Sequence, residues 1–266
     1  MLNSITLGQY YPKESIVHRL DPRSKIILLI LYIAAVFCAS ALWSFLPAAG
    51  FVLLASLLSG IPIRIMLRSI KPLRFILILT FVLNLFFMNG ENILLDLGFA
   101  RITEEALRTA VLYVLRLIFL VTGSSLLTLT TAPIPLTDGL EYLLRPLKVI
   151  RFPAHEMAMM MTIALRFIPT LLEEADKIMK AQAARGADFE SGNLMQRAKA
   201  MIPLLVPLFV SAFRRAGDLA MAMEARCYHG GEGRTKLHVL KMRKTDYLAL
   251  LYGLLLILAT LGVAAL

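Results

Sequence analysis

The sequence predicts an all-α integral membrane protein, and three observations lead to this fold class. Of the 266 residues, 58% are hydrophobic and only 17% are charged, and the mean hydropathy is +0.73. A soluble domain needs a more polar surface, and intrinsic disorder needs low hydrophobicity. Long charge-free runs have the lengths of membrane-spanning helices. The net charge of +10 fits basic loops on one side of a membrane, whereas a nucleic-acid-binding protein would be basic without being this hydrophobic.

Charge-free runs predict five membrane-spanning helices. The first run, 26–63, is long enough for two helices of about 20 residues each. Trp43, Ser44 and Pro47 mark the turn between them. Arg116 falls inside the fourth predicted helix, where it is either a packing partner of a neighbouring helix or a functional charge. The predicted spans are about 26–42, 44–60, 72–89, 105–131 and 247–265.

The basic residues predict the topology. Of the 28 Lys and Arg residues, 25 lie in the segments 1–25, 61–74 and 132–246, and positive charge collects in cytoplasmic loops. We therefore expect a multi-pass protein with its N-terminus inside, its C-terminus outside and no signal peptide. The expected organisation is an N-terminal four-helix membrane region (1–131), a helical region on the cytoplasmic side (132–246) and a C-terminal transmembrane helix (247–266).

Two long amphipathic helices are predicted on the cytoplasmic side, over 154–185 and 194–226. Apolar residues recur in both at three- and four-residue steps. Pro169 predicts a kink or a break in the first helix, and Gly186 suits its C-terminal cap. A methionine-rich face is more often packing than function, but it also suits a surface that binds different partners. The apolar positions include Met157, Met160, Met161, Leu204, Leu208 and Phe209.

The two predicted helices end alike, with an arginine between small residues at an offset of 41 positions. The two endings are Ala184-Arg185-Gly186 and Ala225-Arg226-Cys227. An arginine in a last helical turn suits the macrodipole, and mild local stabilisation is its usual role. The guanidinium also presents five donors in a rigid arrangement that matches carboxylates. Two similar tips therefore indicate docking into two similar grooves on cytosolic partners.

At these residues the sequence resembles a known family, the transmembrane T components of energy-coupling factor transporters (the EcfT or CbiQ-like family). These transporters are prokaryotic ABC-type importers of vitamins and metal ions. The resemblance covers nearly the whole chain and is strongest over 136–148, 165–188 and 203–235. The DPRSK segment at 21–25 also looks like the family. One Ala-Arg-small motif is a weak signal, but both copies in this order are specific.

The resemblance implies a non-catalytic coupling subunit without a cofactor, in the prokaryotic cytoplasmic membrane. Arg185 and Arg226, with their small neighbours, match the family's motif arginines, each of which docks in an acidic groove of one of two ABC-type ATPase subunits. The apolar face of the same helices, including the six positions above, contacts a small membrane protein, the S component, which binds the substrate. Movement driven by ATP then reorients the S component. Cys227 departs from the family's frequent glycine, which leaves the geometry of the second cap open.

The substrate is not readable from this chain, because substrate recognition belongs to the S component. The region 165–235 looks more like systems in which several vitamin-binding S components share one module than like dedicated cobalt or nickel systems. The sequence contains no phosphate-binding loop, and His155-Glu156 lacks the second histidine of a zinc protease motif. Two other classes stay open: a self-sufficient secondary transporter or channel, and a membrane enzyme acting on lipid. The lipid bilayer is the remaining expected partner, and nucleic acid is not expected.

Overall fold

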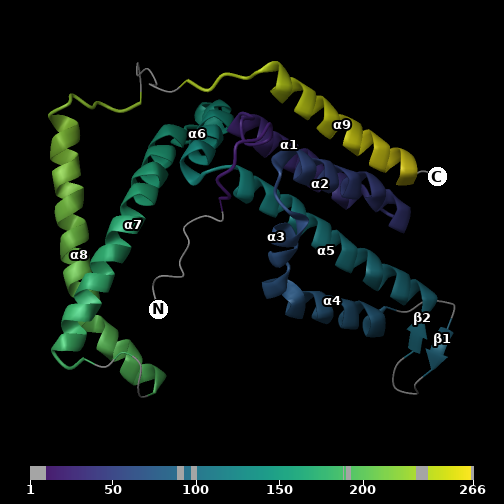
Figure 1. The fold of residues 1–266 in the computed structure, drawn as a ribbon, viewed down its shortest axis with the longest axis horizontal. Helices are drawn as coiled ribbons and strands as arrows, with labels where there is room; N and C mark the ends of the chain where they lie inside the picture. The colour runs from purple at the N-terminus through teal and green to yellow at the C-terminus, as the bar shows by residue number, and fades with distance from the viewer. Residues whose placement is uncertain are drawn as a thin grey trace. The chain divides into compact units, whose positions relative to one another are not determined.

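The computed structural model describes residues 10–88, 93–96, 101–187, 189, 193–231 and 239–264. The chain divides into two compact units. The first, the membrane unit, comprises Gly8–Tyr142 and Leu240–Leu266, and the second, the arm unit, contains Leu143–Val239. The described residues of both units are mainly helical (Figure 1).

The helices of the membrane unit follow the apolar runs of the sequence. α1 starts with Pro22, whose fixed φ suits a first turn, after Asp21 has capped it by accepting a hydrogen bond from the Arg23 amide (2.9 Å). α2 ends where Gly60 takes a left-handed φ of 64°. The elements are α1 (Pro22–Cys38), η2 (Leu42–Phe45), α2 (Leu46–Ser59), α3 (Ile63–Arg68), η3 (Lys71–Leu73), α4 (Arg74–Phe87), α5 (Glu104–Thr130), α6 (Pro133–Leu144), which begins in this unit, and α9 (Lys244–Ala264).

Four helical segments of the described chain are long and apolar enough to cross a membrane. They are Leu42–Ser59, Ile63–Phe87, Glu104–Thr130 and Lys244–Ala264. This confirms four of the five predicted spans as helices of suitable length and composition. α1 has 17 residues, which is at the lower limit for a bilayer, so the first span stays a prediction. Of the predicted turn residues, Trp43 and Ser44 lie in η2, while Pro47 lies in the first turn of α2.

Among the residues that the structure describes, a short β-hairpin is the exception to a helical architecture. β1 (Ile93–Asp96) pairs in antiparallel fashion with β2 (Arg101–Thr103). Thr103 then caps α5, because its side chain accepts a hydrogen bond from the Ala106 amide (3.3 Å). The hairpin thus connects α4 to α5, and the all-α class is confirmed.

The core of the membrane unit lies where α1, α2, α5 and α9 meet (Figure 1). Tyr32 of α1 is buried and donates a hydrogen bond to the Phe119 carbonyl of α5 (2.9 Å). Gly123, one turn further along α5, permits this approach, because a Cβ there would clash with the Tyr32 ring. Phe51 of α2 stacks on Tyr252 of α9, with ring centroids 5.9 Å apart. Aromatic contacts, and the absence of a side chain at Gly123, therefore allow these helices to pack closely.

Arg116 holds the C-terminal end of α1. Its Nη2 donates a hydrogen bond to the carbonyl of Ala39, the residue that follows α1 (2.7 Å). The guanidinium also lies 5.7 Å from the Phe37 ring centroid and 5.5 Å from that of Tyr113. A cation at a helix C-terminus meets the negative end of the macrodipole. Of the two readings of this intramembrane charge, the contacts favour the packing partner.

The arm unit contains η4 (Arg145–Ile150), α7 (Ala154–Ala184) and α8 (Leu194–Glu224). α7 is one continuous helix with Pro169 inside it. Of the predicted kink or break at Pro169, the break is therefore wrong. A proline removes one backbone hydrogen bond, and contacts hold the helix on both sides of Pro169, His155 with Tyr228 before it and Glu174 with Arg215 after it. α8 contains Pro203 and Pro207, and its first part runs at an angle to the rest (Figure 1), as is usual at prolines.

Candidate functional site

The candidate site is the pair of crossed helices in the arm unit. α7 and α8 pack against each other, and Figure 1 shows their C-terminal ends on opposite sides of the crossing. Both helices have 31 residues. Both helices extend beyond the crossing to an exposed C-terminal end.

An ion pair connects the two helices at equivalent positions of the 41-residue repeat. Arg215 of α8 lies 3.0 Å from the Glu174 carboxylate of α7, and the two are 41 residues apart. Hydrogen bonds from Ser211 and then from Arg215 lower the pKa of Glu174 despite partial desolvation. Glu174 and Arg215 each lie 11 residues before the arginine that ends their helix. The crossing therefore places Arg185 and Arg226 at equal distances along their helices.

The α7 tip ends in a Schellman motif. The Gly186 amide donates to the Ala183 carbonyl (2.9 Å), and the Ala187 amide donates to the Gln182 carbonyl (3.0 Å). Gly186 has a left-handed φ of 89°. These two bonds are the defining pair of the motif, and they place Arg185 immediately before the left-handed residue.

The α8 tip repeats the same motif. The Cys227 amide donates to the Glu224 carbonyl (2.9 Å), and the Tyr228 amide donates to the Met223 carbonyl (3.0 Å). Cys227 has a left-handed φ of 55°, although the position favours glycine. Arg226 therefore occupies the position that Arg185 occupies in α7. Cysteine in place of glycine at position 227 therefore leaves the hydrogen bonds of this cap unchanged.

Replacing Cys227 with glycine is expected to stabilise the α8 tip, and replacing Gly186 with alanine is expected to destabilise the α7 tip. A residue with a Cβ in the left-handed region costs about 1–2 kcal/mol. Native-state hydrogen exchange at the Tyr228 and Ala187 amides measures the two effects. Gly217 offers a matched control, because it lies inside α8 with open space around it, and alanine there should not weaken either tip. Unchanged protection at Tyr228 in Cys227→Gly would contradict the strain argument.

All six tip residues predicted from the sequence are exposed. Arg185 and Arg226 lie at the two ends, each between small exposed neighbours. Within the described part of the chain, no group of three or more His, Cys, Asp or Glu residues is arranged to hold a metal ion. The exposed tip residues are Ala184, Arg185, Gly186, Ala225, Arg226 and Cys227.

The predicted apolar contact positions divide between exposed and buried. Met160 of α7 is 58% exposed and Phe209 of α8 is 61% exposed. Met157 and Met161 are also exposed and Leu208 is partly so, whereas Leu204 is only 6% exposed. Leu204 is therefore not available to a partner in this conformation.

An outward apolar face on α8 was missed by the sequence reasoning. Phe213 is 75% exposed and lies one turn beyond Phe209. Ile202 and Val206 continue the same stripe and are also more than half exposed. Spacing of three and four residues was the available signal.

The α8 tip is also braced against the start of α7. The Tyr228 hydroxyl lies 3.5 Å from Nε2 of His155, in the first turn of α7. Gly231 lies so close to the His155 ring that a Cβ would clash with it. Tyr228 follows the left-handed Cys227 directly, so this contact holds the chain as it leaves the tip. His155 thus has a packing role, which its isolated position in the sequence did not reveal.

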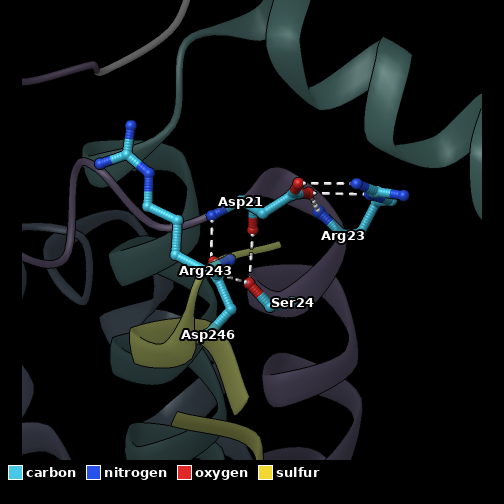
Figure 2. A network of polar contacts seen from close by, with 5 residues as sticks. All are labelled: Asp21, Arg23, Ser24, Arg243 and Asp246. Carbon is cyan, nitrogen blue, oxygen red and sulfur yellow. Dashed lines mark hydrogen bonds and ion pairs between the residues drawn. The ribbon is translucent and has the colours of Figure 1, made fainter. Parts of the chain in front are cut away.

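In the membrane unit, a buried polar network joins the starts of α1 and α9 (Figure 2). Asp246 is 1% exposed, and its carboxylate accepts hydrogen bonds from the Asp21 amide (2.8 Å), the Arg243 amide (2.7 Å) and the Ser24 hydroxyl (2.7 Å). Burial raises the pKa of Asp21, but hydrogen bonds from Arg23 outweigh it, so the pKa lies below its usual value. The DPRSK segment thus holds the start of α1 against the start of α9. Its partner Asp246 was missed by the sequence reasoning.

Comparison with known proteins gives consistent matches. A family model described as "Cobalt transport protein" matches residues 13–237. A protein of Thermosediminibacter oceani named "Energy-coupling factor transporter transmembrane protein EcfT" is 55% identical over 248 residues, which cover 93% of each chain. Proteins of the same name from Acidaminococcus fermentans and Bacillus subtilis are 56% and 48% identical, over 93% and 89% of this chain and 92% and 89% of theirs.

Proposed function

We propose a coupling role for this chain, which belongs to the cobalt transport protein family and, within it, to the transmembrane proteins of energy-coupling factor transporters. It is a multi-pass membrane protein of a transporter. In the proposed role it transmits the movement of two cytosolic ABC-type ATPase subunits to a small membrane S component that binds the substrate. The chain itself is non-catalytic, and ATP is hydrolysed on the partner subunits.

The observation that carries the proposal is the equivalence of the two arginine tips. Arg185 and Arg226 occupy the same position in two Schellman motifs, at equal distances from the crossing of α7 and α8. A pair of related ATPase subunits offers two similar grooves, and two equivalent tips fit such a pair. Acidic residues in each groove would receive the guanidinium in bidentate fashion.

Co-purification tests the proposal directly. The chain is expressed together with the genes that neighbour it, and the detergent-solubilised complex is weighed intact by mass spectrometry. We expect two ATPase subunits and one S component with each copy of this chain. A complex that lacks any ATPase would overturn the proposal. Uptake by this chain alone in liposomes with an ion gradient would support the alternative of a self-sufficient secondary transporter or channel.

The exposed apolar residues of the arm unit are the proposed contact for the S component. Met157, Met160 and Met161 of α7 and Leu208 and Phe209 of α8 supply this surface, and the buried Leu204 is left out. Methionine side chains adapt to different partners, which suits a module shared among several vitamin-binding S components. The imported substrate, a vitamin or a metal ion, is then set by the S component.

Replacing Met160 with glutamine is expected to weaken binding of the S component more than binding of the ATPases. Met160 is 58% exposed, so the change removes apolar contact area without disturbing a core. The ratio of S component to ATPase in the purified complex measures the effect. Met195→Gln serves as a control, because Met195 is 70% exposed on α8 but lies outside the proposed surface. Equal loss of both partners in Met160→Gln would show that the residue only supports the fold.

The proposed orientation is the one that the basic segments predict. In it the N-terminus lies inside and the C-terminus outside, which places the arm unit and its arginines on the cytoplasmic side with the ATPases. Cysteine accessibility to a membrane-impermeant reagent tests this orientation in whole cells. In a variant whose exposed native cysteines Cys38 and Cys227 are replaced by serine, a cysteine introduced at the exposed Arg214 should react only after the cells are opened.

A further inference from the structure

A cavity of about 300 Å³ lies within the membrane unit, between α1, α2, α5 and α9. On each of these helices the first and last lining residues are seven positions apart. At 1.5 Å per residue, the cavity therefore extends about 10 Å along the helices. The four stretches are Lys25–Tyr32, Phe51–Leu58, Gly123–Thr130 and Thr245–Tyr252.

The inner part of the cavity is apolar and offers water at most one partner, the hydroxyl oxygen of Tyr32. Tyr32 lies at its deep end, and its hydroxyl already donates to the Phe119 carbonyl. Leu54, Leu58 and Leu248 line the cavity and are 43%, 44% and 65% exposed, so the cavity opens onto the apolar surface of membrane helices. Water needs two or more polar partners to occupy a buried site. A hydrocarbon chain therefore matches the chemistry of the inner part of the cavity better than water does.

The polar end of the cavity is fully bonded within the protein. Lys25 lines this end with Thr130 and Thr245, and its ammonium donates to the carbonyls of Thr130 (2.9 Å) and His18 (3.3 Å) and to the Thr131 hydroxyl (3.2 Å). These three bonds use the three donors of a lysine. A ligand headgroup would therefore meet the positive charge of Lys25 without replacing its hydrogen bonds.

Further basic residues flank the stretches that line this end of the cavity. Lys13 is exposed and donates to the carbonyl of Gly60, two residues beyond the lining Leu58. Lys244 is exposed and precedes the lining Thr245. The side chain of Arg243 points away from the Asp246 network (Figure 2). The nearby Asp21 and Asp246 carboxylates are both engaged inside that network, and the exposed Glu14 pairs with Arg19. The acidic groups near the mouth are thus paired, which leaves Lys13 and Lys244 as its exposed cations.

We propose that this cavity binds one acyl chain of an anionic phospholipid, whose phosphate lies beside Lys13 and Lys244. The acyl chain fills the apolar part between the four helices, and the basic rim selects an anionic headgroup over a zwitterionic one. Bound in this way, the lipid would fill the space between α1, α2, α5 and α9. The site belongs to the membrane unit and does not depend on the coupling role of the arm unit.

Native mass spectrometry of the purified full chain tests the proposal, with phosphatidylglycerol and phosphatidylcholine as probes. Ala249 lines the cavity, so Ala249→Trp fills it. Ala259→Trp is the matched control, because Ala259 is exposed further along α9 and does not line the cavity. We expect one phosphatidylglycerol on the wild type, at least fivefold less on Ala249→Trp, and no loss on Ala259→Trp. Replacing Lys13 and Lys244 together by alanine should remove the preference for phosphatidylglycerol.

A second variant keeps the test decisive if Ala249→Trp is destabilised. Thr245 is exposed at the mouth of the cavity, so Thr245→Trp blocks entry without disturbing buried contacts. Where Ala249→Trp lowers the thermal midpoint in detergent, Thr245→Trp replaces it and should show the same loss of lipid. Retention of phosphatidylglycerol at the wild-type level in the folded blocking variant would overturn the proposed cavity. Equal retention of phosphatidylcholine and phosphatidylglycerol by the wild type would overturn the proposed anionic lipid.

Discussion

Replacing both Arg185 and Arg226 with alanine is expected to abolish substrate uptake and to release the ATPase subunits from the complex. Each arginine is the exposed last residue before a left-handed turn, so its removal changes the partner contact and leaves the helix intact. In the proposed complex each guanidinium meets a carboxylate in a groove. Leaving a buried charge without its partner costs about 3–5 kcal/mol. At about 1.4 kcal/mol per tenfold, each tip then contributes roughly a hundredfold or more to ATPase affinity.

Single variants separate the two tips from each other. Arg185→Ala or Arg226→Ala alone should reduce uptake while one docking contact remains. Lysine at either position keeps the charge but loses the rigid fork, so it should restore only part of the binding. Arg214→Ala is the matched control, since Arg214 is exposed on α8 away from the tip. Affinity for the ATPases and uptake into cells are both measured. Normal uptake by the double variant would exclude docking through these arginines.

The two helix tips could be located from the sequence because they share the same local pattern. Helix ends are set by local interactions, so a repeated Ala-Arg-small pattern encodes a repeated backbone motif. The left-handed turn at Gly186 is readable from glycine alone. The same turn at Cys227 is not, because cysteine rarely adopts a positive φ. The hydrogen bonds from the Cys227 and Tyr228 amides to the last turn of α8 stabilise this conformation in place of a glycine.

Contacts between distant segments were less accessible to sequence reasoning. Leu204 and Phe209 belong to the same apolar run, yet one is buried and the other is exposed. Which of them faces α7 depends on the angle at which the helices cross, and the Glu174–Arg215 pair at that crossing lies 41 residues apart. Asp246 meets Asp21 across 225 residues. A single sequence contains no signal for such pairs, whereas apolar runs and helix caps are local.

Replacing Asp246 with alanine is expected to destabilise the membrane unit strongly. The carboxylate accepts from the Arg243 amide at the start of its own helix, which is half of a capping box. It also accepts from the Asp21 amide at the start of α1. Alanine leaves the buried Asp21 amide and the partly buried Arg243 amide without this acceptor, and an unsatisfied buried donor costs about 1–3 kcal/mol. The loss of unfolding free energy should be on the order of 3 kcal/mol.

Thermal unfolding of the full chain in detergent measures this effect, and two variants set its scale. Asp246→Asn keeps one acceptor oxygen and should fall between Asp246→Ala and the wild type. Asp218→Ala removes an exposed carboxylate from α8 and should leave the midpoint unchanged. Because Asp246 joins α9 to α1, its loss should also increase hydrogen exchange in the first turns of both helices. A wild-type midpoint in Asp246→Ala would mean that packing alone holds α9 against α1.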